Sequence, residues 1–323
     1  MTTLTQYESS PVRQLNILRC WRIRVLLLVL IIFATLCNGC SVKKIAMNHL
    51  GDALAKSGST FSSDNDPDMI KAAAPFSLKL MESVLAETPE HTGLLLALSS
   101  GFTQYAFAFV VQEADETEEN NLIRAMETRA RALRLYLRAR DYGLRALDIR
   151  HPGFAEALHG EPEKVVQDLK KGDVPYAYWT AVSWAGAISM AKNNADLIAD
   201  LPKVEALIDK ALALDESFDN GAIHSFLIAY DMNRASGTGN PEENARKHFS
   251  RAVELSDGKQ AGPYVTMAES VSLPKQDKKE FILFLERALA INADAKPEWR
   301  LANVIMQKKA RWLLQRTDKL FVN

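Results

Sequence analysis

The feature that most constrains the fold is a short segment that recurs five times and each time closes a stretch of amphipathic sequence. In these stretches apolar residues are spaced three and four positions apart, which places them on one face of an α-helix. Each copy is followed within a few residues by Pro, Asp, Gly or Asn, residue types that end helices or begin turns. Strands alternating polar and apolar residues are not evident, so we predict an all-α protein. The five copies are Ser83-Val84-Leu85, Arg145-Ala146-Leu147, Lys210-Ala211-Leu212, Arg251-Ala252-Val253 and Arg287-Ala288-Leu289.

The spacing of the copies indicates a repeat. The last three lie 41 and 36 positions apart, an interval that suits a helix-turn-helix unit. Ala245, Phe249 and Ala252 match the Ala-x₃-Phe-x₂-Ala pattern of a tetratricopeptide repeat, in which small Ala permits close helix approach and Phe fills the groove. Earlier copies lie 62 and 65 positions apart and lack the Phe. We therefore expect a tetratricopeptide-like helical repeat array, a solenoid or bundle, with irregular insertions.

One uncharged stretch requires a choice between a buried helix and a membrane span. Residues 92–112 contain no charged side chain over 21 positions, which is long enough to cross a bilayer. Ser99, Thr103 and Gln104 interrupt the stretch, and each polar group would cost free energy in lipid. We interpret it as a helix buried by its neighbours.

The N-terminus has the pattern of an export signal. Four arginines precede an uncharged apolar run, Val25–Leu36, which is shorter than the roughly 20 residues that a membrane-spanning helix needs. Gly39 then leads into Cys40, which resembles the lipobox where lipoprotein precursors are cleaved and acylated, although Cys37 stands where Leu is usual. We expect lipidation at Cys40, with ordinary cleavage or retention of the signal as the alternatives.

This assignment fixes the expected domains and the cysteine chemistry. We expect a lipoprotein signal peptide at 1–39, a lipid-anchored segment and spacer at 40–66, and a helical repeat domain at 67–323. The chain has three cysteines, and lipidation at Cys40 with loss of Cys20 and Cys37 would leave no free thiol. Disulfides, thiol catalysis and zinc–thiolate sites are then excluded.

Motifs for catalysis and cofactor binding are missing from the sequence. We find no His-Glu-x-x-His, Gly-x-Ser-x-Gly, phosphate-binding loop or Gly-x-Gly-x-x-Gly, and the six histidines are scattered. His151 and His159 flank a turn, where a solvated or capping role is more usual than metal binding. The net charge of −1 gives no drive toward nucleic acid. We therefore expect no enzyme activity, no metal or cofactor and no nucleic-acid partner.

A row of arginines is the first candidate binding feature. Arg131, Arg138 and Arg145 repeat every seven residues, which aligns them along one helix face. They form either a solvated face, paired with Glu127, Asp141 and neighbouring helices, or a surface whose guanidinium groups contact organic acids or an acidic partner protein.

An aromatic cluster is the second candidate. Tyr176, Tyr178, Trp179 and Trp184 open a segment with few charges. Core packing accounts for such residues, and the alternative is a ligand groove, because Tyr and Trp combine apolar faces with a polar tip.

In order and spacing, several segments resemble the T component (TatT) of tripartite ATP-independent periplasmic (TRAP) transporters over nearly the whole mature chain. No single motif is very specific, but the series is. The segments are Pro75 to Thr88, Arg138 to Phe154, Tyr178-Trp179 with Trp184, Gly221-Ala222-Ile223-His224, Ala245 to Ala252, Arg300-Leu301-Ala302-Asn303 and Ala310 to Leu314.

The resemblance implies a lipid-anchored periplasmic protein that associates with the solute-binding protein of a TRAP transporter and does not itself move solute. It also implies a homotrimer with hydrophobic clefts or a pore, for which the aromatic cluster and the arginine row are candidate linings. Ser41, rather than Asp, after the lipidated cysteine resembles the signal for outer-membrane sorting. The alternative function is a structural envelope scaffold built on tetratricopeptide-like repeats.

Overall fold

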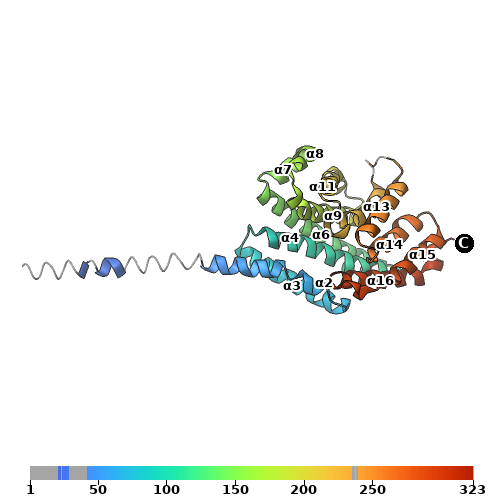
Figure 1. Ribbon diagram of the computed structural model, residues 1–323, viewed down its shortest axis with the longest axis horizontal. Coiled ribbons are helices and arrows are strands. Elements are labelled where there is room, and N and C mark those ends of the chain that lie inside the picture. The colour runs from blue at the N-terminus through green and yellow to red at the C-terminus, as the bar shows by residue number, and fades with distance from the viewer. Residues whose placement is uncertain (1–20, 23, 29–41, 235–236, 238, 323) are drawn as a thin grey trace, which may run out of the picture. The chain divides into compact units, whose positions relative to one another are not determined.

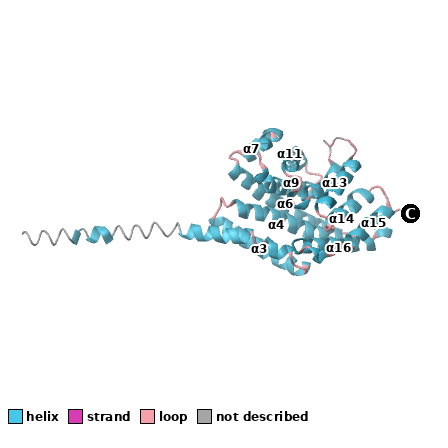
Figure 2. Ribbon diagram, in the orientation of Figure 1, coloured by secondary structure: helices cyan, strands magenta, loops and turns pink. Residues whose placement is uncertain are grey.

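A computed structural model describes residues 21–22, 24–28, 42–234, 237 and 239–322, which divide into two units, Met1–Leu50 and Gly51–Asn323. All regular structure in the described ranges is helical, so the predicted all-α class is confirmed (Figure 2). In the first unit, residues 21–22, 24–28 and 42–50 are helical. Cys20, Cys37 and Cys40, with the expected cleavage region, lie outside the described residues.

The first half of the second unit contains two helical hairpins and a long central helix. Asp66 begins α3 by accepting hydrogen bonds from the backbone N–H groups of Asp68 and Met69, and Asn121 begins α6 by accepting from Arg124. Side chains that cap free N–H groups explain why the helices start at these positions. The helices are α2 (Gly58–Ser62), α3 (Pro67–Glu87), α4 (Thr92–Tyr105), η1 (Ala106–Val111), α5 (Gln112–Thr117) and α6 (Leu122–Arg150).

Helix α6 packs closely against α4 and α9 (Val174–Met190), and the three lie together in the middle of the unit (Figure 1). Four alanines of α6, spaced by seven residues, are fully buried, and small side chains allow neighbouring helices to approach. The alanines are Ala125, Ala132, Ala139 and Ala146. This stripe positions the neighbouring arginine row of α6 at the surface.

The second half continues with shorter helices around two further clusters of buried apolar residues. Phe249 of α13 lies between Tyr264 and Phe284, with ring centroids 5.2 Å apart in both pairs. The elements after α6 are α7 (Phe154–Gly160), α8 (Pro162–Val165), η2 (Val166–Asp168), η3 (Lys171–Asp173), α9, α10 (Ala195–Ile198), α11 (Leu201–Leu214), η4 (Phe218–Asn220), α12 (Ala222–Tyr230), η5 (Asp231–Asn233), α13 (Pro241–Leu255), α14 (Gly262–Met267), η6 (Ala268–Ser272), α15 (Lys278–Leu289), η7 (Ala293–Ala295), η8 (Pro297–Trp299), α16 (Arg300–Gln315) and α17 (Thr317–Leu320).

The five recurring segments lie at the ends of α3, α6, α11, α13 and α15, and the middle residue of each is buried. This explains why the segments are alike, since each must bury a small or apolar side chain just before a helix stops. The wider repeat character of the array stays a prediction.

Two features of the fold differ from the expectation. The spacer expected at 57–66 contains α2, and the carbonyl oxygen of Ser63 accepts a hydrogen bond from Arg300 of α16 at 2.8 Å. The compact unit begins at Gly51, so these residues belong to it. The second difference is that the helix formed by the uncharged stretch widens into a π-helical turn, η1, before it continues into α5. The composition of the stretch did not predict this π-helical turn.

The helix Thr92–Thr117 is, within the described ranges, the one long and apolar enough to cross a membrane. Half of its most apolar window is buried inside the unit, including the polar side chains of Ser99 and Thr103. Thr103 Oγ1 donates to the carbonyl oxygen of Ser99, one turn earlier, at 2.7 Å. These contacts support the interpretation as a core helix.

Candidate functional site

The arginine row lies on the exposed side of α6, as its seven-residue spacing predicts. Arg131, Arg138 and Arg145 are all exposed and extend toward α3, α4 and the turn between them. Arg134, one turn after Arg131, is exposed as well. We refer to these four side chains as the arginine face.

The middle arginine is held by a group of contacts. Arg138 Nη2 lies 2.5 Å from Glu82 Oε1, and its guanidinium carbon lies 5.0 Å from the centre of the Phe102 ring. Tyr142 Oη donates to the same oxygen of Glu82 at 2.6 Å. The Glu82 side chain is only 9% exposed, so its carboxylate is largely removed from water, and both of its oxygens already contact donors of the protein. Burial, followed by the bond to Glu82, raises the pKa of Tyr142 and keeps the phenol a donor.

The other arginines of the face have no carboxylate partner in the described part of the chain. Arg131 Nη2 donates to Tyr105 Oη at 3.4 Å and lies over that ring, and Arg145 donates to the carbonyl oxygen of Pro89. Arg134 makes neither an ion pair nor a hydrogen bond with any described residue. Asp141, one of the expected partners, instead pairs with Arg140 at 2.8 Å. The pKa of Glu113 is lowered chiefly by Lys71 and in part by the charge of Arg131, and Arg138 is paired with Glu82. The positive charge that no described carboxylate balances is therefore that of Arg134 and Arg145.

The aromatic cluster is divided between core and surface. Trp184 is 1% exposed, and its Nε1 donates to Asp200 Oδ2 at 3.2 Å. Tyr178 is also buried and donates to the carbonyl oxygen of Ala222 at 3.4 Å, and burial raises its pKa strongly. Tyr176 and Trp179 are partly exposed. Tyr178 and Trp184 thus pack in the core, whereas part of the Tyr176 and Trp179 side chains remains exposed to solvent.

Tyr176 belongs to a cluster that sequence reasoning missed. The Arg150 guanidinium lies 4.6 Å from the centre of the Tyr176 ring, and Arg150 Nε lies 2.6 Å from Asp173 Oδ1. His151 Nε2 lies 3.1 Å from Asp173 Oδ2, which also accepts from the backbone N–H of Lys170. Burial opposes ionisation of Asp173, but the donors from Lys170, Arg150 and His151 together lower its pKa.

The two predicted sets of residues lie against different neighbours. The arginine face contacts α3, α4 and the turn between them, whereas Tyr178 and Trp184 contact residues of η4, α12 and the start of α11. Two arginines of α6 that the prediction did not include contact the aromatic cluster: Arg150 lies over Tyr176, and Arg140 lies over Trp184 at 5.1 Å. The predicted residues therefore form two surfaces and not one groove.

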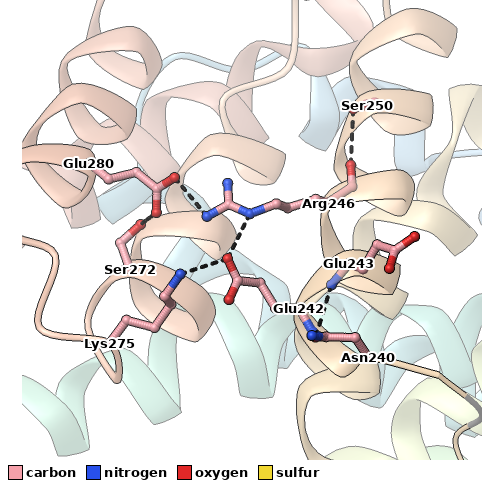
Figure 3. Close-up of polar contacts among 8 residues, drawn as sticks. All are labelled: Asn240, Glu242, Glu243, Arg246, Ser250, Ser272, Lys275 and Glu280. Atoms are coloured by element: carbon pink, nitrogen blue, oxygen red, sulfur yellow. Dashed lines mark hydrogen bonds and ion pairs between the residues drawn. The ribbon is translucent and has the colours of Figure 1, made fainter.

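A further charged network lies at the base of α13 (Figure 3). Arg246 bridges Glu242 at 2.9 Å and Glu280 at 2.8 Å, and Lys275 Nζ lies 2.7 Å from Glu242. Ser272 donates to Glu280 at 2.8 Å. Every charge in this network has an opposite partner, so it ties α13 to η6 and α15 and leaves little unsatisfied charge for a ligand.

Metal-binding geometry is not found in the described ranges, where no group of three or more His, Cys, Asp or Glu side chains could hold an ion. The acids and histidines near the two predicted surfaces are engaged with arginines or with backbone donors. What the arrangement offers chemically is recognition of anions at the arginine face and apolar contact at Tyr176 and Trp179.

Comparison with known proteins places the chain in a family. The chain is 27% identical over 306 residues to an uncharacterized protein of Treponema pallidum (strain Nichols), covering 89% of this chain and 95% of the relative. Residues 63–321 match the family described as TRAP transporter T-component. The match spans nearly the whole helical unit, and the chain belongs to the TRAP transporter T-component family, accessory components of a transport system.

Proposed function

We propose that this protein is a periplasmic, lipid-anchored accessory component that binds the solute-binding protein of a TRAP transporter through its arginine face. Family membership supports the transporter assignment. The observation that carries the choice of surface is the set of exposed guanidinium groups on α6 that lack carboxylate partners among the described residues. Such groups form bidentate hydrogen bonds with carboxylates, so the matching surface is acidic.

The arginine face is organised for this role. The tyrosine below Arg131 and the carbonyl oxygen below Arg145 restrict the two side chains without neutralising them. A guanidinium that is already oriented loses less conformational freedom on binding, which favours affinity. Arg138 is neutralised by Glu82 and serves to fix the geometry of the row.

Further parts of the proposal concern the ligand and the assembly. Tyr176 and Trp179 are the proposed contacts for a small or hydrophobic ligand, with Tyr178 and Trp184 as the buried support. We propose a homotrimer, in which several copies of a weak contact act together. Lipid at Cys40 would hold the protein at the periplasmic face of the outer membrane. No catalytic role is proposed.

The decisive experiment compares two charge reversals. Arg134→Glu removes a guanidinium that has no hydrogen-bond or ion-pair partner among the described residues, and Arg311→Glu, on the exposed side of α16, is the matched control. The solute-binding protein is first identified by affinity capture of the tagged protein from its own cells and mass spectrometry. We expect Arg134→Glu to weaken binding of that purified protein roughly tenfold, mainly through slower association, and Arg311→Glu to leave binding unchanged.

The outcomes separate the two candidate functions. Equal loss in both variants would show that only net charge matters, and no loss in either would exclude the arginine face. Capture of other envelope-building proteins, without any solute-binding protein, would favour the structural scaffold instead.

A further inference from the structure

Two histidines that are far apart in sequence meet between α12 and α13. His224 Nδ1 lies 2.8 Å from His248 Nδ1, and the ring centroids are 5.0 Å apart. His224 is 6% exposed, and the side chain of His248 is 18% exposed. At this separation the two nitrogens share one proton, because one must donate and the other accept.

The outer nitrogens of the pair each face a carboxylate. His224 Nε2 lies 3.4 Å from Glu216 Oε2, and His248 Nε2 lies 3.3 Å from Asp231 Oδ2. The result is a continuous series of carboxylate, imidazole, imidazole and carboxylate. It joins the turn after α11, helix α12, helix α13 and η5.

The number of protons in this series follows from its geometry. One proton lies between the rings, and a proton on each outer nitrogen faces a carboxylate, which makes one imidazole positive and leaves the other neutral. The outer contacts, at 3.4 and 3.3 Å, are ion-pair contacts, and His224 Nε2 makes no hydrogen bond with a described residue. A fourth proton would place two N–H groups face to face at 2.8 Å. The pair therefore accepts one positive charge and opposes a second.

Charged groups from every side determine how strongly the second proton is opposed. Glu216 and Asp231 favour positive charge, and Arg251 of α13, which pairs with Glu216 at 2.5 Å, disfavours it. Burial, then the charge on His248, lowers the pKa of His224 despite the opposing effect of Glu216. Helix α14 carries no charged side chain. The acidic side chains of the other elements packed around the pair interact with groups other than the two histidines. Glu205 and Asp209 of α11 pair with Arg234, Glu269 of η6 pairs with Lys309, and the charge of Asp219 of η4 acts on Tyr178.

We propose that His224 and His248 form a proton-sharing pair that holds α12 against α13 at neutral pH and releases them when both imidazoles become charged. In the open state the His224 imidazole returns to the ordinary pKa of 6.5, whereas in the closed state its burial and the charge on His248 hold that pKa lower. The open state thus binds more protons below that pH. The part of the closing free energy that depends on this second proton is fully present above pH 6.5 and is lost as the pH falls.

Amide hydrogen exchange on the whole chain from pH 8 to pH 5 tests the proposal. After correction for intrinsic exchange chemistry, we expect opening of α12 and α13 to increase below pH 6.5 by up to about tenfold per pH unit, the limit for one proton. Amides of α4 should show no such slope. A slope that is absent from α12 and α13, or present equally in α4, would overturn the proposal.

Two further measurements identify the groups. His248→Gln removes the charge of His248 but leaves His224 buried, so the pH slope should weaken without disappearing, whereas His159→Gln, at an exposed histidine on α7, should leave it unchanged. If His248→Gln does not fold, NMR titration of the wild-type imidazoles decides. Two coupled titrations, one displaced below the ordinary value, support the pair, and two independent titrations at ordinary values refute it.

Discussion

At the scale of single residues, Gly143 of α6 lies close to both α4 and α9. A Cβ at this position would lie 2.2 Å from Thr180 Oγ1 and 3.1 Å from Ser99 Oγ. Thr180 is fully buried and donates to the carbonyl oxygen of Tyr176, so it has no free space in which to move. The absence of a side chain at Gly143 therefore sets the spacing of the three central helices.

Gly143→Ala should lower the free energy of unfolding by about 1–3 kcal/mol, because the new methyl group must displace packed helices. Urea unfolding measures the loss. Gly160→Ala is the control, since no atom lies within 4 Å of its Cβ position, and it should leave stability unchanged or slightly higher. Combining Gly143→Ala with Thr180→Ala should recover part of the lost stability, because the clashing side chain becomes smaller. If Gly143→Ala unfolded at the same urea concentration as wild type, Gly143 would not set the spacing of the three helices.

Asp173→Asn should destabilise the protein at neutral pH by about 1–2 kcal/mol, because the buried Asp173 side chain loses its charge-assisted hydrogen bond to Arg150, whose own side chain is 32% exposed. The pKa of Asp173 is lowered on folding, so its stabilisation is present above the unfolded value of 3.8 and is lost as pH falls through the folded value. Urea unfolding from pH 7 to pH 3 should show the two proteins converging in acid. Asp168→Asn, at an exposed carboxylate, should behave like wild type throughout.

The candidate residues show what a helical sequence reveals and what it leaves open. Seven-residue spacing correctly aligned Arg131, Arg138 and Arg145, because residue spacing fixes direction around a helix axis. It did not reveal Glu82, which lies on another helix, nor that Trp184 is covered by α11. Likewise, His224 and His248 are 24 residues apart, and only the packing of α12 on α13 brings them together.

At the scale of helices, α16 is joined to its neighbours by two buried amides. Asn303 accepts from the backbone N–H of Ala261 at 2.8 Å and donates to the carbonyl oxygen of Lys259 at 2.9 Å. Gln307 donates to three carbonyl oxygens near the end of α15, that of Ile291 being closest at 2.7 Å. Each amide satisfies backbone groups at a helix end that water cannot reach.

Asn303→Ala should cost about 3 kcal/mol of stability, because two buried backbone groups lose their partners at once. The thermal midpoint and the urea midpoint should both fall. Arg311→Ala, on the exposed side of the same helix, should change neither by a comparable amount. A loss equal to that of Arg311→Ala would indicate that water replaces the amide.

The ends of helices are predictable in this chain, but their internal irregularities are not. Asp66 and Asn121 cap α3 and α6 at the positions where a polar residue precedes an apolar series. The π-helical segments η1 and η6 have no comparable signal, since both contain ordinary helix-forming sequence. The two π-helical segments therefore depend on packing, and Lys309 of α16 contacts both of them. Its Nζ lies 5.8 Å from the centre of the Phe107 ring in η1 and 2.8 Å from Glu269 in η6.

At the scale of the compact unit, its C-terminal helices contact its first helices through charged groups. Glu119, after α5, accepts from Arg316 at 2.7 Å and from Lys319 at 3.1 Å. Lys308 of α16 lies 3.8 Å from Asp68 of α3. We call this set of contacts the terminal contact.

Reversing the charges of Glu119 and Arg316 one at a time should weaken the terminal contact, and reversing both should restore it. The coupling energy expected for such partly exposed groups is about 0.5–1 kcal/mol, and it should shrink in high salt. A double-mutant cycle of Glu119→Arg and Arg316→Glu, followed by urea unfolding at low and high salt, measures it. Additive effects of the two changes would show that the groups act independently.

The hydrogen bond from Arg300 to Ser63 spans 237 residues of sequence, and this separation governs the order of folding. Neighbouring helices pair through local contacts, which form quickly, whereas the hydrogen bond from Arg300 to Ser63 requires closure of a very long loop. Because synthesis begins at the N-terminus, α2 and α3 can make this contact only after the residues of α16 have been synthesised. Truncated chains should remain open at this contact and be cleaved first in α2, which limited proteolysis of a chain ending before Pro297 would reveal.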